Sequence, residues 1–96
     1  DHTIGVNFSG KVENIILWVS EKQYLYFETL PIHKTQKLIN KTASGFIISL
    51  DVCCNYELEQ WILHYGNNIK VIEPQELKER ILFQLKKTLK NYENNL

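Results

Sequence analysis

The sequence predicts an α+β domain, in which a four-stranded antiparallel sheet and two helices are followed by one additional helix. Three observations indicate this class. Short runs rich in β-forming residues, one of which has apolar residues at every second position, have the pattern of strands. Other segments carry apolar residues at helical spacing, and Gly or Pro marks several boundaries. With 96 residues, the chain has the length of one domain and can bury a single core layer.

The first strand is predicted at Val12–Val19. Its centre, residues 15–19, is a compact β-rich run that is too short for a stable helix and lacks helical spacing. We expect residues 12–94 to form the domain. Residues 1–11 have little periodicity and are expected to be a linker or the end of a preceding domain. Because the chain begins at Asp1 and contains no methionine, we expect it to be a fragment of a larger protein.

A short helix is predicted from Ser20 to about Thr29. Ser20 has the hydroxyl of an N-cap, and Gln23 three residues later completes a capping box. Residues 25–27 would also suit a strand, so that alternative stays open. Pro31 ends the helix in either case, because the residue before a proline disfavours the helical conformation.

Residues 32–41 have mixed polarity and are predicted to be extended, and Thr42–Gly45 is predicted to be a turn. In the next run, Phe46–Val52, every second residue is apolar, which is the period of a half-buried strand. The two segments therefore form a predicted hairpin.

Asn55 is a suitable N-cap for the second helix, which ends at Gly66 as a left-handed C-cap. Four apolar residues of this helix fall at i, i+3, i+4 and i+7 and form one buried stripe: Leu58, Trp61, Ile62 and Tyr65. Ile69–Ile72 is the fourth predicted strand. Pro74 follows in the first turn of the last helix, where its missing N–H costs nothing.

The last helix is predicted to be stable and amphipathic. One side carries the apolar residues Leu77, Ile81, Leu82, Leu85, Leu89 and Tyr92. The acidic residues Glu73, Glu76 and Glu79 lie at its start, and Lys86, Lys87 and Lys90 lie toward its end. This arrangement suits the helix dipole at both termini.

The order β-α-β-β-α-β with one extra helix predicts a ferredoxin-like arrangement, whose helices cover one face of the sheet. Two alternating sets of residues then face opposite ways: Leu17, Ile48, Leu50 and Val71 toward the helices, and Ile16, Trp18, Ile47, Ser49 and Ile72 away from them. This second face is too apolar to be left in water. We expect the last helix to fold back across it, or a partner domain or second copy to cover it. The predicted interface residues are Ile16, Trp18, Ile47 and Ile72.

Eleven basic and eleven acidic residues cancel, and Arg80 is the only arginine. This balance argues against a strongly electrostatic binder of duplex nucleic acid, which needs a basic excess to displace phosphate counterions. The adjacent Cys53 and Cys54 are expected to be reduced thiols rather than a disulfide, which indicates a reducing compartment and a cytoplasmic protein. No apolar run approaches the roughly 20 residues that span a bilayer, so no membrane partner is expected.

The best candidate site is the segment His33–Lys37. On a strand, His33, Thr35 and Lys37 point the same way and present an imidazole, a hydroxyl and an ammonium group, a set suited to a phosphate or a nucleotide edge. The alternative is a solvated edge strand that its charges protect from aggregation. No His or Cys pair has zinc-ligand spacing, and His64 suits a helix terminus. No nucleophile–base pair appears either, so we expect no metal, no cofactor and no catalytic residue.

Three segments carry a family resemblance: Leu30–Lys37, which is similar to a Pro-x-His-x-Ser-Gln-Lys segment; Leu58–Tyr65 with its closing Gly66; and Val71–Leu77, which leads into the charged last helix. From about residue 13 to residue 92, the chain resembles the C-terminal extension domain, or WCX domain, of bacterial WYL-domain transcriptional regulators. Thr35 stands where this family commonly has serine.

The resemblance implies a non-enzymatic regulatory domain that binds an effector, dimerises, or both. In this family a winged helix-turn-helix binds DNA and a WYL domain senses a ligand, and the extension completes the regulatory module. Residues 1–11 would be the exit from the WYL domain. The implied partners are the WYL and helix-turn-helix domains of the same chain, DNA through the latter, and a second copy of the regulator. Because members of the family sense single-stranded DNA, a nucleotide or single-stranded nucleic acid is the expected effector. The predicted ligand-binding residues are His33, Thr35, Gln36 and Lys37.

Two other classes share this order of elements. An RRM-like RNA-binding module needs aromatic residues with basic neighbours on the two central strands, where Gly45–Ile48 offers one aromatic and no adjacent basic residue. An acylphosphatase-type enzyme binds phosphate with arginine in the loop after the first strand, where this chain has Ser20–Lys22, with an acid and no arginine. The RNA-binding module stays as the alternative, and we expect no enzyme.

Overall fold

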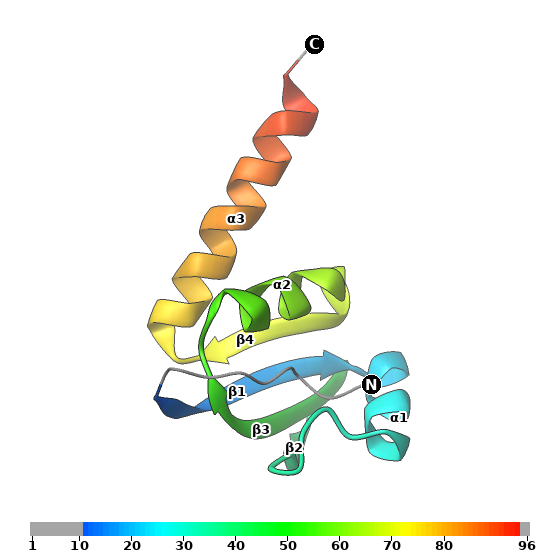
Figure 1. Cartoon of the computed structure of the whole chain (residues 1–96). Helices are drawn as coiled ribbons and strands as arrows, with labels where there is room; N and C mark the ends of the chain where they lie inside the picture. Colours follow the sequence, from blue (N-terminus) through cyan, green and yellow to red (C-terminus); the bar gives the residue numbers. More distant parts are fainter. Residues whose placement is uncertain (1–10, 95–96) are drawn as a thin grey trace.

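The sheet has the strand order β2-β3-β1-β4, and its neighbouring strands are antiparallel (Figure 1). The computed structural model describes residues 11–94, within which the strands are β1 (Val12–Ser20), β2 (Lys37–Lys41), β3 (Gly45–Cys53) and β4 (Ile69–Glu73). The helices of this part are α1 (Glu21–Thr29), α2 (Tyr56–His64) and α3 (Gln75–Glu93), and a 3-10 turn covers Gly66–Asn68. The predicted α+β, ferredoxin-like order is confirmed. Except for Lys11, the predicted linker at residues 1–11 lies outside the described residues.

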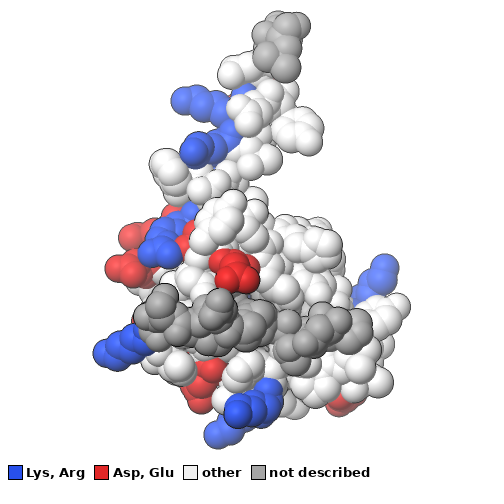
Figure 2. All heavy atoms as spheres, viewed as in Figure 1, with Lys and Arg blue, Asp and Glu red and all other residues white. Residues whose placement is uncertain are grey.

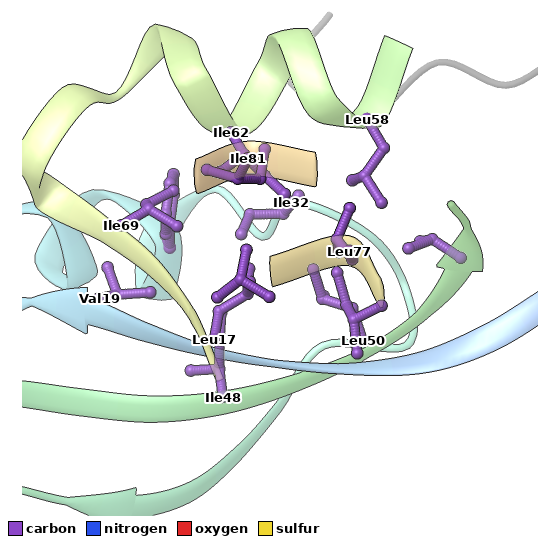
Figure 3. Packing of buried hydrophobic residues seen from close by; sticks show 14 of the residues in the cluster. Leu17, Val19, Ile32, Ile48, Leu50, Leu58, Ile62, Ile69, Leu77 and Ile81 are labelled. Carbon is purple, nitrogen blue, oxygen red and sulfur yellow. The ribbon is translucent and has the colours of Figure 1, made fainter. Parts of the chain in front are cut away.

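β1 organises the sheet because it pairs with β3 on one side and with β4 on the other. Leu17 lies opposite Ile48 in β3 and opposite Val71 in β4. Alternate residues of these strands are buried under the helices, as a period of two predicts. The core that results joins the sheet to α2 and to the base of α3 (Figure 3), and it includes Leu17, Val19, Ile32, Ile48, Leu50, Leu58, Ile62, Ile69, Leu77 and Ile81.

N-cap side chains fix the starts of the first two helices at the predicted residues, Ser20 and Asn55. The Ser20 hydroxyl accepts a hydrogen bond from the Gln23 amide at 3.3 Å, and the Asn55 side chain accepts one from the Leu58 amide at 2.9 Å. Each of these bonds satisfies a backbone donor that the helix itself leaves without a partner. Gly66 follows α2 with a φ of 56°, in the left-handed region that glycine adopts at little cost.

Two predicted boundaries differ from the structure. Residues 32–36 form a turn rather than part of an extended segment, with the Gln36 amide bonded to the His33 carbonyl at 3.1 Å. The strand begins only at Lys37. The turn forms because its polar side chains bond to nearby backbone groups and compete with strand pairing. Pro74 is the N-cap of α3, one position before its first turn, and has an extended backbone with a ψ of 163°.

Gly45 lies where the neighbouring strand and an indole ring leave no room for a side chain. A Cβ at this position would lie 2.1 Å from the Val19 carbonyl oxygen and 2.9 Å from Trp18 Nε1. The predicted turn before it is present, since the Thr42 amide bonds to the Gly45 carbonyl at 2.8 Å. This glycine therefore sets how closely β1 and β3 approach at this end of the sheet.

α3 begins on the domain and then leaves it (Figure 1). Its first turns bury Leu77 and Ile81 in the core, and its main contacts are with β4 and α2. The rest of the helix extends away from the sheet, so the predicted alternative in which it folds back across the second face is not observed. Within residues 11–94, no helix combines the length and the apolar character needed to cross a membrane.

Candidate functional site

The predicted ligand-binding segment is a turn whose polar groups bond to each other. The Thr35 amide donates a hydrogen bond to His33 Nδ1 at 3.2 Å, and the Thr35 hydroxyl lies 2.8 Å from the same nitrogen. His33 Nδ1 therefore accepts a hydrogen bond from within the turn itself.

Thr35 and Gln36 also fasten this turn to the rest of the domain. The Thr35 hydroxyl accepts a hydrogen bond from the Asp51 amide at 2.9 Å and so ties the turn to β3. The Gln36 side chain accepts a hydrogen bond from the Ile32 amide at 2.9 Å and donates one to the Phe27 carbonyl at 3.1 Å, at the end of α1. Both side chains therefore have a structural role.

The four predicted ligand-binding residues do not share one strand face. The alternation that would align His33, Thr35 and Lys37 requires a strand, and the strand starts at Lys37. Lys37 is exposed and His33 is half-buried, whereas Thr35 and Gln36 are bonded within the domain. Ligand binding by these residues stays a prediction.

The predicted interface residues lie together on the sheet face that the helices do not cover. Trp18 lies opposite Ile47 in β3 and opposite Lys70 in β4, and Lys70 Nζ is 5.8 Å from the centre of a Trp18 ring. Ile16, Trp18, Ile47 and Ile72 are each half-buried. The predicted division of the sheet into two faces is confirmed, and the covering of this face by a partner stays a prediction.

An open pocket of about 410 Å³ lies where α3 meets the edge strand β4. Its walls are mostly apolar and come from both elements and from β1: Trp18, Ile69, Val71, Ile81, Leu82 and Leu85. Lys70 and Lys78 also line it, and the described residues around it include no acidic side chain. The pocket suits an apolar group. Sequence reasoning missed it because it depends on the contact between β4 and α3, which no local pattern encodes.

Beyond this pocket, α3 carries an apolar stripe, defined as Leu82, Leu85, Leu89 and Tyr92. These side chains are 42%, 47%, 57% and 85% exposed in that order. Their spacing of three, four and three positions places them along one side of the helix. The periodicity of the sequence had grouped them with Leu77 and Ile81, but only those two are buried. The stripe therefore starts at the pocket and runs to the free end of α3.

An ion pair anchors the base of α3 to α2. Arg80 donates hydrogen bonds to Glu59 Oε2 through Nε, at 2.7 Å, and through Nη2. Glu59 is only 7% exposed, whereas the side chain of Arg80 is 46% exposed. The hydrogen bond from Arg80 to Glu59, and the negative charge of that carboxylate, raise the pKa of Arg80, so the guanidinium group stays protonated. Glu76, one turn earlier on α3, lies 3.9 Å from Arg80 Nη1.

The described residues contain no group of three or more His, Cys, Asp or Glu side chains that could hold a metal ion. Burial, followed by the nearby Glu13 carboxylate, raises the pKa of the Cys54 thiol to about 11. A thiol with such a pKa is protonated at neutral pH and is a weak nucleophile. The surroundings of Cys54 therefore suit a packing role better than a reactive one.

A comparison with protein-family models matches the WCX domain over residues 11–89. The chain belongs to the WCX domain family. The matched region contains the four described strands, α1, α2 and α3 as far as Leu89, and it confirms the family resemblance found in the sequence. A comparison with curated protein sequences finds no significant match.

The charges of α3 in this WCX domain are mixed near its base and mainly basic toward its end. Glu76 and Glu79 lie near its beginning, and Lys86, Lys87 and Lys90 lie toward its end. Figure 2 shows acidic and basic side chains together beside the base of the protruding helix and basic ones farther along it. Lys78 and Arg80 balance these acidic residues at the base, so the helix of the WCX domain has no net charge where it leaves the body and is basic beside the exposed part of the apolar stripe.

Proposed function

We propose that this WCX domain is the dimerisation element of a bacterial WYL-type transcriptional regulator, with α3 as its contact surface. At the family level, the WCX domain is a regulatory domain and does not belong to an enzyme family. In such a regulator, DNA binding belongs to a helix-turn-helix domain and ligand sensing to a WYL domain of the same chain. The proposed setting is the cytoplasm, where DNA-binding regulators of bacteria act.

The observation that carries the proposal is the apolar stripe on α3. Its four large side chains are 42–85% exposed on a helix that leaves the domain body. Burial of apolar surface is favourable by about 25 cal/mol per Å², so a continuous stripe of this kind is typical of a contact between helices. A second copy of the chain carries the same stripe, and two such stripes can cover each other with two-fold symmetry.

Sedimentation velocity of the 96-residue chain, from micromolar to millimolar concentration, tests dimerisation. We expect a monomer–dimer equilibrium that Leu85→Glu shifts to monomer, because it places a charge in the middle of the stripe. Leu25→Glu is the matched control, since Leu25 is an exposed leucine of α1. Circular dichroism verifies that both variants are folded. A chain that stays monomeric throughout, or a dimer that Leu85→Glu leaves intact, would contradict the proposal.

Effector binding at the turn before β2 is a second candidate. It is favoured by Lys34 and Lys37, which are exposed and follow the half-buried His33 in the chain. The phosphates of a nucleotide or a single-stranded nucleic acid would lie near these ammonium groups. Fluorescence anisotropy with a labelled single-stranded DNA oligonucleotide, at low and moderate salt, tests this role. Saturable binding weakened by His33→Ala or Lys37→Ala would support it, and no binding at low salt would eliminate it.

The RRM-like alternative has less support from the geometry. Phe46, the aromatic residue expected on a central strand, stacks on Tyr24 of α1 with ring centres 4.2 Å apart, on the side of the sheet that the helices cover. The opposite face offers Trp18 with Lys70 as its basic neighbour. A labelled single-stranded RNA in the same titration tests this alternative, which requires binding that Trp18→Ala removes.

A further inference from the structure

We infer that two copies of the chain pair through antiparallel α3 helices, so that the free end of each helix covers the pocket between α3 and β4 of the other copy. The inference rests on the proposed dimerisation and adds its direction, its register and the occupant of the pocket. Three features carry it: the continuity of the stripe with the pocket, the excess of lysine toward the end of α3, and the positions of Glu79 and Lys86.

The stripe and the pocket form one apolar surface. Leu82 and Leu85 belong to both, because they line the pocket and begin the stripe that Leu89 and Tyr92 continue. A helix laid along the stripe in the opposite direction therefore brings its own free end over the pocket. The same holds for both copies at once, so the contact closes on itself as a two-fold interface does.

The pocket and the lysines near the helix end select the antiparallel direction. The end of α3 carries Lys86, Lys87 and Lys90, whereas at its base Glu76 and Glu79 are balanced by Lys78 and Arg80. Parallel packing would place the lysine-rich ends of the two helices side by side, and it would leave both pockets without an apolar occupant. Antiparallel packing separates these ends and places each beside the base of the other helix, where the charges balance.

Glu79 and Lys86 indicate the register. They are seven positions apart, so they lie on the same edge of the stripe and do not contact each other within one helix. Residues that flank an apolar seam set the orientation of paired helices through their charges. When Glu79 of one copy faces Lys86 of the second copy, two-fold symmetry also places Lys86 of the first copy opposite Glu79 of the second. In the same register Leu82 faces Leu85 of the second copy, at the centre of the contact.

This register also determines what fills the pocket. Leu89 of one copy lies over Lys78 of the second copy, whose side chain lines the pocket. The lysine stem can cover an apolar side chain while its ammonium group stays in water. Tyr92 lies near Gln75 of the second copy. Leu89 and Tyr92 are the two most exposed residues of the stripe, and this arrangement removes both from water.

A charge-exchange series, measured by sedimentation equilibrium at low salt, tests the direction and register. Glu79→Lys and Lys86→Glu each place like charges together at two symmetric positions, so each should weaken the dimer about tenfold. The double variant restores opposite charges and should return the dissociation constant to within about threefold of the original. Lys87→Glu is the matched control, and its dissociation constant should also stay within about threefold of the original. Lys87 lies off the stripe, with its Nζ 5.2 Å from the centre of the Phe83 ring.

Disulfide cross-linking in a Cys54→Ser background measures the register independently. The variant with both Lys78→Cys and Leu89→Cys should form a covalent dimer under mild oxidation, whereas Leu89→Cys alone should not. A covalent dimer of Leu89→Cys alone, or a double charge variant that is not rescued, overturns the antiparallel inference but leaves the proposed dimerisation intact. A chain that is monomeric at every concentration overturns both, and the pocket would then have a different occupant.

Discussion

Removal of Arg80 should destabilise the domain, because it leaves a carboxylate buried without its cation. Glu59 is 7% exposed and accepts hydrogen bonds from Arg80 Nε, at 2.7 Å, and from Nη2. In Arg80→Leu the charge of Glu59 stays in a site that water reaches poorly. The base of α3 then lacks its polar contact with α2.

The expected loss is about 2 kcal/mol in the free energy of unfolding. A buried acceptor left without a partner costs about 1–3 kcal/mol, and breaking a fully buried ion pair costs about 3–5 kcal/mol. Because the side chain of Arg80 is 46% exposed, solvent screens this pair and the lower range applies. The double variant Glu59→Leu, Arg80→Leu removes both charges, so it should recover about 1 kcal/mol or more of that loss.

Urea denaturation followed by far-UV circular dichroism measures these free energies at a concentration where the chain is monomeric. Lys87→Leu is the control on the same helix, because the Lys87 ammonium lies over the exposed Phe83 ring and not beside a buried carboxylate. Its effect should stay within about 0.5 kcal/mol. An Arg80→Leu variant as stable as this control, or a double variant less stable than Arg80→Leu, would refute the reasoning.

Three further predictions concern single residues. Gly45→Ala should lose about 2 kcal/mol of stability, because its methyl carbon would lie 2.1 Å from the Val19 carbonyl oxygen, and an unchanged melting temperature would contradict this close approach. The pKa of the Cys54 thiol is raised from 9.0 to about 11, so the folded state holds this proton more tightly than the unfolded state does. The free energy of unfolding should therefore be unaffected by this thiol below about pH 9 and should fall as the pH rises toward about 11. Urea midpoints measured across this range should decline less for Cys54→Ser than for the original chain. An equal decline for both proteins would contradict this prediction. Thr35→Val should cost about 1–2 kcal/mol in the free energy of unfolding, because the Asp51 amide loses its acceptor. Chemical denaturation should show a smaller loss for the control Thr88→Val, which removes only a surface hydrogen bond to the Gln84 carbonyl.

Signals that act over a few residues were sufficient to predict the elements. Ser20 and Asn55 mark helix starts because each side chain bonds to a backbone amide three residues later. Gly66 marks the end of α2 because its left-handed backbone suits glycine. The alternation in β1 and β3 likewise identified both faces of the sheet, because the side-chain period of a strand is a property of its own backbone.

The turn at residues 32–36 was not predicted, because long-range bonds hold it in addition to its local ones. Gln36 bonds to a carbonyl nine residues earlier in the chain, and the Thr35 hydroxyl bonds to an amide sixteen residues later. The polarity pattern of the segment contains neither partner. The predicted strand face for His33, Thr35 and Lys37 was therefore wrong in its geometry, while the role of these residues in binding stays open to the oligonucleotide titration.

The apolar side of α3 was predicted, but what covers it was not. Leu77 and Leu89 have the same side chain on the same side of the helix, yet the first is buried in the core and the second is exposed. Helical periodicity identifies the side, and it does not distinguish cover by the chain's own core from cover by another molecule. The charges of Glu79 and Lys86 suit the helix dipole, and only the exposed stripe between them suggests a role in pairing.

A helix held at one end and unsupported at the other converts small rotations into larger displacements. α3 is held at its base by Leu77, by Ile81 and by the bond from Arg80 to Glu59. The part beyond Ile81 is about 18 Å long at 1.5 Å per residue, so a tilt of about 10° at the base moves the tip by about 3 Å. Shifts of about 1–2 Å in helices at subunit interfaces already accompany allosteric transitions. The ion pair between α2 and α3 thus lies at the pivot of a lever whose far end is the surface that we propose to meet a second subunit.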